Sequence, residues 1–227
     1  MGKEKLKNVI WLAGSMASGK TTLCKGLLEK LTDGEEPISV IDEGIYYTHY
    51  KKSKVIALGK IGRNQCTGLD SVYSKLGSDG VTTTMKAALE TKAKYIIVDC
   101  AFATHSWTRK WTNEGLREKM RLVVIFQYLD YWNNLKRLAQ RKMKKHNENP
   151  KSEFKYEHFG DVPNPDTVYK NVLSKNSESR NIFAKFEGTS ERQEDYQKAN
   201  ATIKMEVADM SAKKVLKTSL KFIKENC

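Results

Sequence analysis

A glycine-rich segment near the start of the chain has the residue types and spacing that bind phosphate. It reads Gly14-Ser15-Met16-Ala17-Ser18-Gly19-Lys20-Thr21-Thr22 and matches the pattern G-x-x-x-x-G-K-[ST]. Glycines let backbone N–H groups turn inward around phosphate oxygens, and a helix that starts there adds partial positive charge. We expect Lys20 to reach the β- and γ-phosphates of ATP, and the Thr21 hydroxyl to bind Mg²⁺. The alternative is a solvated glycine turn before an ordinary helix.

Two acidic residues follow apolar runs that are typical of buried strands. Asp42 follows Ile38–Ile41, and Asp99 follows Tyr95–Val98. Asp42 is a candidate general base that takes the proton of an attacking hydroxyl, with Glu43 as its substitute. Asp99 is expected to hold Mg²⁺, directly or through water. Asp42 could instead cap a turn or bind a metal-bound water, and many buried strands end in an aspartate without any metal.

A strongly basic segment over 130–145 is predicted to be a helix, and it carries Arg137 and Arg141 one turn apart. The planar guanidinium group binds phosphate oxygens through two N–H donors. Either arginine could therefore stabilise charge on a phosphoryl group during its transfer. The alternative is a solvated basic face, because several lysines surround the pair. Asp130, the first residue of this segment, is expected to cap the helix that follows from Tyr131 to Lys145.

Two further segments mix aromatic and basic side chains. One contains Tyr46 and Tyr47, and the other contains Trp107, Arg109 and Trp111. We interpret both as loops after strands, where aromatic rings could stack on nucleic-acid bases while cations follow the backbone. The tryptophans could instead pack in the core from one face of a helix.

The elements that would position these residues alternate along the chain. Apolar runs predict strands over 8–13, 38–41, 55–59, 95–99, 122–126 and 201–207. Helical spacing of apolar residues predicts helices over 19–31, 82–92, 106–120, 130–145, 166–187 and 211–225. This alternation indicates an α/β fold, a parallel sheet with helices on both faces, in which the residues after each strand share one crevice. We expect one domain over 1–227, with 60–80 as a loop region and 146–190 as a helical lid or insertion.

The composition points to a basic protein with reduced thiols. The 227 residues have a formal net charge of +13, which favours a polyanionic partner such as nucleic acid, although many lysine-rich proteins are simply basic. The 4 cysteines are scattered and none forms a C-x-x-C pair, which argues for a cytoplasmic location and against a zinc site. No apolar run approaches the length of a membrane span, so we expect no membrane partner.

These features resemble the small P-loop kinases, the group that contains nucleoside monophosphate, shikimate and gluconate kinases. The resemblance rests on Gly14 to Thr22, Asp42, Asp99 and the pair Arg137 and Arg141. It implies a P-loop kinase fold with a helical lid, and it covers about two thirds of the chain; only the glycine segment is highly specific.

A second resemblance concerns the segment from Ala57 to Ser71. Its Cys-x-Gly-x-Asp part, Cys66 to Asp70, is similar to phage-type P-loop kinases that act in DNA base hypermodification. Such enzymes phosphorylate 5-hydroxymethyluracil within DNA, so the resemblance implies that Cys66, Gly68 and Asp70, with Arg63 nearby, shape the acceptor side. Gly68 could let backbone approach a ligand, and Asp70 could bind a base edge or hydroxyl; the alternative is a rigid turn with Asp70 as a helix cap.

Together, these observations favour an ATP-dependent kinase acting on a hydroxyl of nucleic acid, foremost a 5-hydroxymethylpyrimidine in DNA. A kinase of the same fold acting on a small molecule or free nucleotide is the first alternative. A nucleic-acid-binding switch driven by nucleotide hydrolysis is the second.

Overall fold

A twisted, mostly parallel sheet organises the chain. The computed structural model describes residues 6–14, 17–59, 61, 68–100, 110–130, 132–134, 136, 137, 140 and 198–227. Within them, 7 strands form one sheet in the order β2-β3-β4-β5-β1-β6-β7. The strands are β1 (Lys7–Gly14), β2 (Ile38–Asp42), β3 (Ile45–Tyr50), β4 (Val55–Leu58), β5 (Tyr95–Asp99), β6 (Met120–Tyr128) and β7 (Ala201–Glu206). From β4 to β7 all neighbours pair in parallel, whereas β2 and β3 pair antiparallel.

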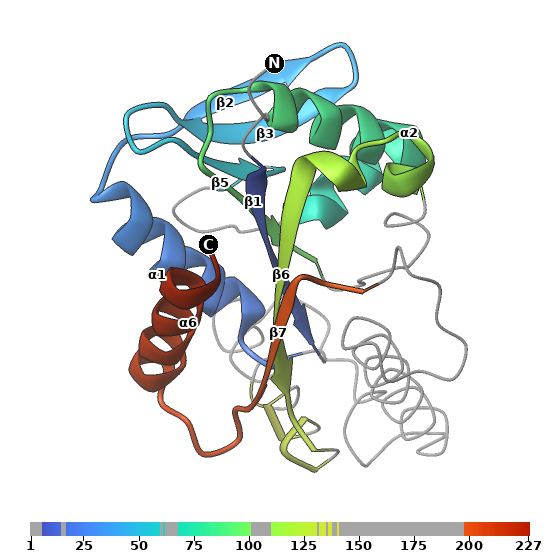
Figure 1. Cartoon of the computed structure of the whole chain (residues 1–227). Helices are drawn as coiled ribbons and strands as arrows, with labels where there is room; N and C mark the ends of the chain where they lie inside the picture. The colour runs from blue at the N-terminus through green and yellow to red at the C-terminus, as the bar shows by residue number, and fades with distance from the viewer. Residues whose placement is uncertain are drawn as a thin grey trace, which may run out of the picture.

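Helices cover both faces of this sheet (Figure 1), as predicted from the alternation of elements. The helices with both ends among the described residues include α1 (Lys20–Thr32), α2 (Gly68–Glu90), the short 3-10 helix η1 (Arg117–Lys119) and α6 (Ala212–Asn226). Helices α1 and α6 pack together on one side, and α2 lies on the other. Side chains of β1 alternate between these sides because successive residues of a strand point to opposite faces. Val9 and Trp11 join the core under α2, and Ile10 and Leu12 join the core under α1 and α6.

The outer strands differ from the sequence prediction. Residues 38–41 were expected to form a buried strand, but β2 is a largely exposed edge strand. Residues 45–50 were expected to be a loop, but they form β3, which lies between β2 and β4. The turn Glu43-Gly44 joins β2 to β3, a two-residue connection of the kind that closes β-hairpins. The aromatic content of 45–50 suits a strand, and this was the signal missed in the sequence.

Helix α2 is also longer than predicted, because it starts at Gly68 inside the expected 60–80 loop. Gly77 has φ 68° and ψ −167°, so α2 consists of two helical segments that meet at this residue. The small and polar residues around Gly77, among them Ser74, Ser78 and Asp79, break the apolar spacing by which the first segment could have been predicted. Residues 82–90 are helical as predicted.

Elsewhere the agreement is mixed. Strand β7 and helix α6 occur where expected, and Ser211 caps α6 by accepting from Lys214 N–H. Within 106–120, residues 110–113 are helical, but β6 already begins at Met120. The expected lid over 146–190 lies outside the described residues.

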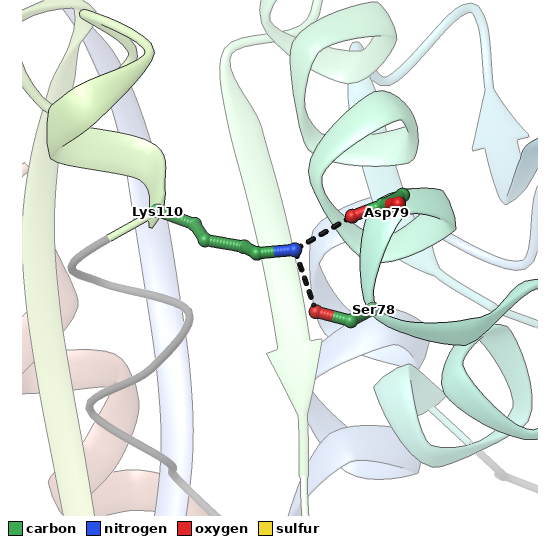
Figure 2. A network of polar contacts seen from close by, with 3 residues as sticks. All are labelled: Ser78, Asp79 and Lys110. Carbon is green, nitrogen blue, oxygen red and sulfur yellow. Dashed lines mark hydrogen bonds and ion pairs between the residues drawn. The ribbon is translucent and has the colours of Figure 1, made fainter.

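A polar contact ties the second segment of α2 to the chain after β5 (Figure 2). Lys110 Nζ lies 2.6 Å from Asp79 Oδ1 and donates to Ser78 Oγ at 2.9 Å. The hydrogen bond and charge of Lys110 lower the pKa of Asp79. Because both partners are substantially solvent-exposed, this ion pair positions elements more than it stabilises them.

Candidate phosphate-binding and metal site

The glycine segment forms the turn between β1 and α1, which is the context that its motif requires. Gly14 ends β1 with φ 140°, and a Cβ at this position would lie 2.1 Å from the carbonyl oxygen of Gln127 on β6. Only glycine therefore fits there. Gly19, with φ 94°, is the N-cap of α1, so the loop leads directly into a helix N-terminus. This geometry allows backbone N–H groups and the helix dipole to face one anion.

The side chain of Lys20 turns back over this loop. Its Nζ donates to the carbonyl oxygen of Gly14 at 3.0 Å, although the residue is only 8% exposed. A buried ammonium group is costly unless it has strong acceptors. Charged phosphate oxygens are stronger hydrogen-bond acceptors than a carbonyl oxygen. The Lys20 ammonium group, which lies over the loop, is therefore in a position to bind a phosphate there.

Thr21 and Asp99 meet at the start of α1 and the end of β5. Thr21 Oγ1 donates to Asp99 Oδ2 at 3.2 Å, and Asp99 is 6% exposed. A hydroxyl and a carboxylate are the oxygen ligands that Mg²⁺ prefers, and Mg²⁺ usually keeps waters and phosphates as its other ligands. No group of three or more His, Cys, Asp or Glu capable of holding a metal occurs in the described part of the chain. The contact thus fits a Mg²⁺ site that the nucleotide would complete.

The first turn of α2 packs directly on the end of β5. A Cβ at Gly68 would lie 2.0 Å from the Asp99 carbonyl oxygen, and one at Gly59 would lie 1.9 Å from the Gly68 carbonyl oxygen. Gly68 is therefore needed for backbone packing, which accounts for it without any ligand. Asp70 lies in this first turn of α2. The alternative interpretation of Asp70 as a helix cap needs a helix that starts nearby, and α2 starts two residues before it.

Asp42 is not brought to this cluster. It is exposed and ends β2, three strand positions from β5, or about 14 Å at the usual strand spacing. Strand β2 runs in the same direction as β5, because it is antiparallel to β3 and β3 is antiparallel to β4. Asp42 therefore shares the expected edge of the sheet but lies at its far end.

The tyrosine segment is not an exposed loop, and this expectation was wrong. Tyr46 is 1% exposed and Tyr47 is 9% exposed, and both belong to the core under α2. Lys75 Nζ lies 4.9 Å from the centre of the Tyr46 ring. Burial raises the pKa of both tyrosines. Neither ring is available to stack on a base in this conformation.

The basic segment is helical at its described residues, and its start is capped as predicted. Asp130 Oδ2 accepts from Asn133 Nδ2 at 2.5 Å and Oδ1 accepts from Asn133 N–H at 3.0 Å, and these two hydrogen bonds lower the pKa of Asp130. Arg137 donates to the carbonyl oxygens of Val207 at 2.7 Å and Ala208 at 3.2 Å, just after β7. Its role toward a transferred phosphoryl group stays a prediction.

The remaining sequence candidates divide into three groups. Trp111 is fully buried and its ring centre lies 5.4 Å from that of Trp11, so the core-packing alternative holds for it. The side chain of Asp70 is not described. The following candidates lie outside the described residues: Ser15, Met16, Arg63, Cys66, Trp107, Arg109 and Arg141.

One residue beside the loop was missed in the sequence. Gln127, on β6, donates from Nε2 to the Ser18 carbonyl oxygen at 3.3 Å and is 2% exposed. The available signal was a polar residue directly after the apolar run Leu122–Phe126.

No family model and no curated protein matches this chain. Among solved structures, it is similar to shikimate kinase from Acinetobacter baumannii in complex with shikimate, at 16% identity and TM-score 0.39 over 98% of this chain and 96% of that one. A sugar kinase from Janibacter gives 12% identity and TM-score 0.41 over 96% and 95%. A provisionally named kinase from Chloroflexus aurantiacus gives 11% identity and TM-score 0.46 over 100% of both chains. All three TM-scores are below 0.5, so the proposals below rest on the geometry of this chain. Within its described residues, no helix is long and apolar enough to cross a membrane.

Proposed function

We propose that this protein is an ATP-dependent kinase that transfers the γ-phosphate to a hydroxyl group. The observation that carries the proposal is the convergence of Lys20, Thr21 and Asp99 at the mouth of one glycine turn. A glycine turn alone would bind an anion. The added pairing of a hydroxyl with a buried carboxylate supports a triphosphate bound together with a cation.

Each residue of this group has a distinct task in the proposed reaction. The loop N–H groups and Lys20 bind and orient the phosphates and neutralise their charge. Thr21 and Asp99 would hold Mg²⁺, which when bound would supply positive charge to offset the charge of the phosphates.

A small hydroxyl-bearing acceptor is the form of this proposal that the geometry supports better. The nucleic-acid interpretation rested in part on aromatic rings that could stack on bases, and Tyr46 and Tyr47 are buried. The net charge of +13 still favours a nucleic-acid acceptor as the second candidate, with 5-hydroxymethylpyrimidine DNA as its most specific form.

The test is transfer of labelled γ-phosphate from ATP to two panels of acceptors. One panel holds sugars, hydroxy acids and free nucleosides, and the other holds duplex DNA with and without 5-hydroxymethylpyrimidines. We expect a product in the first panel, and a loss of about 10²–10³-fold in transfer on Lys20→Ala, because a charge-stabilising donor is removed. Label in modified DNA alone would establish the second candidate. Slow hydrolysis with no labelled acceptor would favour a nucleotide-driven switch, and absence of any nucleotide binding would overturn the proposal.

A further inference from the structure

Gln127 is fixed beside the phosphate loop by strand pairing. In the parallel pair of β1 and β6, Gly14 lies opposite Gln127, and the two backbones approach so closely that Gly14 has no room for a side chain. A Cβ at Gly19 would lie 3.7 Å from Gln127 Nε2, so the amide reaches across the base of the loop. There it donates to the carbonyl oxygen of Ser18 at 3.3 Å.

This hydrogen bond fixes the direction of the Gly19 N–H group. The Ser18 carbonyl and the Gly19 N–H belong to one peptide unit, and no cis peptide bond occurs in the described chain. In a trans peptide the C=O and N–H point in opposite directions. When Gln127 holds the Ser18 carbonyl toward β6, the Gly19 N–H must point away from β6. We propose that Gln127 is a positioning residue that keeps the Ser18–Gly19 peptide oriented for phosphate, an inference that rests on the proposed nucleotide site.

The amide oxygen of Gln127 indicates that this residue is not there for packing alone. Its Oε1 is buried and has no hydrogen-bond partner within the described residues, and the same holds for Ser18 Oγ. A buried polar atom without a partner costs folding free energy, and protein cores normally avoid it. An apolar side chain of similar length at this position would remove that cost. If Gln127 served packing alone, methionine would replace it without loss.

Two substitutions separate positioning from packing. Gln127→Met keeps the length and removes the amide. It removes the unpaired Oε1, which favours folding, and also the donor to the Ser18 carbonyl, which disfavours it, so the two effects largely cancel and the melting temperature should stay close to that of the wild type. Gln127→Glu keeps the shape, but an ionised carboxylate cannot donate to the Ser18 carbonyl. We expect each to raise the Kd for a fluorescent ATP analogue about tenfold at pH 8, which corresponds to one hydrogen bond. For Gln127→Glu alone, lowering the pH to 6 should restore part of the affinity, because burial favours protonation and the protonated acid donates again.

The matched control is Asn8→Ala. Asn8 is a buried amide on β1 at the opposite end of the same sheet, and its Nδ2 donates to the Lys94 carbonyl oxygen at 3.4 Å. It should lower the melting temperature without changing the Kd. Unchanged Kd values for both Gln127 variants would overturn the inference, as would a Kd that changes only together with the melting temperature. Lys20→Ala tests the proposed function separately: if it binds the analogue as tightly as the wild type, the nucleotide site itself is wrong.

Discussion

At the scale of single residues, Asp99 and Asp42 differ sharply in their surroundings. Asp99 is buried and accepts a hydrogen bond from Thr21, whereas Asp42 is exposed at the end of an edge strand. In the proposed reaction, a carboxylate that holds Mg²⁺ or touches the reacting groups must lie near the glycine segment Gly14–Thr22. Only Asp99 of these two meets that condition.

We therefore expect opposite results from two equivalent substitutions. Asp99→Asn should lower kcat by about 10²-fold or more and raise the Mg²⁺ concentration needed for half-maximal rate, because a neutral amide is a weaker metal ligand. Asp42→Asn should change kcat less than about threefold, since it removes no group near the loop. Steady-state kinetics over a Mg²⁺ titration measure both effects. A collapse of kcat in Asp42→Asn, with ATP binding intact, would restore Asp42 as the general base.

The positions of the glycine segment and of Asp99 could be predicted from the sequence, whereas the residues that pack around them could not. The spacing of Gly14, Gly19 and Lys20 requires a particular loop, so the pattern and the geometry agree. The position of Asp99 at the carboxyl end of a buried strand could be predicted, because an apolar run followed by an acid is typical of such an end. Gln127 could not, because its role depends on which strand pairs with β1, and pairing is a property of the whole sheet.

At the scale of elements, the start of the basic helix is set by Asp130. Its carbonyl accepts from Asn134 N–H at 2.9 Å and its carboxylate accepts from Asn133 N–H, which together form an N-cap. The lowered pKa means that the native state favours the ionised carboxylate.

Asp130→Ala should therefore destabilise the protein by about 1 kcal/mol at pH 7, and Asp130→Asn by less, because asparagine also caps helices. The contribution specific to the ionised carboxylate is present above the unfolded pKa of 3.8 and is lost as the pH falls through the lowered native value. Denaturant unfolding of the wild type and Asp130→Asn at pH 7 and near pH 3 measures it. A stability difference that stays constant between these pH values would contradict the capping charge.

Helices and strands were predicted correctly where the apolar residues form a strong run or a regular spacing. The prediction failed for segments whose structure depends on the strands and helices packed against them. Strands β1, β5 and β6 are continuous apolar runs because helices cover both of their faces. Strand β3 interrupts its aromatic residues with Thr48 and His49, so it contains no such apolar run. The first segment of α2 was hidden by Gly77, at which the helical spacing is interrupted.

At the scale of the whole molecule, the charge balance affects how any acceptor experiment is interpreted. A protein with 40 Lys and Arg against 27 Asp and Glu binds polyanions through counterion release, and that binding weakens steeply with salt. Binding of DNA at low salt would therefore show only non-specific electrostatic attraction and would not show that DNA is the phosphate acceptor. Phosphate transfer at physiological salt is the informative quantity.

The exposed edge strand β2 could pair with the same strand of a second molecule, and acidic residues at its ends oppose this pairing. As the outermost strand it presents backbone donors and acceptors to solvent, and Ile38 and Ile41 are 47% and 62% exposed. Such an edge invites pairing with the same strand of another molecule, and charged residues commonly prevent it. Asp42 and Glu43 stand at one end of β2, and Glu35 and Glu36 precede it at the other, so antiparallel self-pairing would bring acids together. Replacing Asp42 by Asn and Glu43 by Gln should then increase the amount of oligomer measured by light scattering, most strongly at high protein concentration. If that variant stays monomeric, these two acids do not prevent pairing of β2 between molecules.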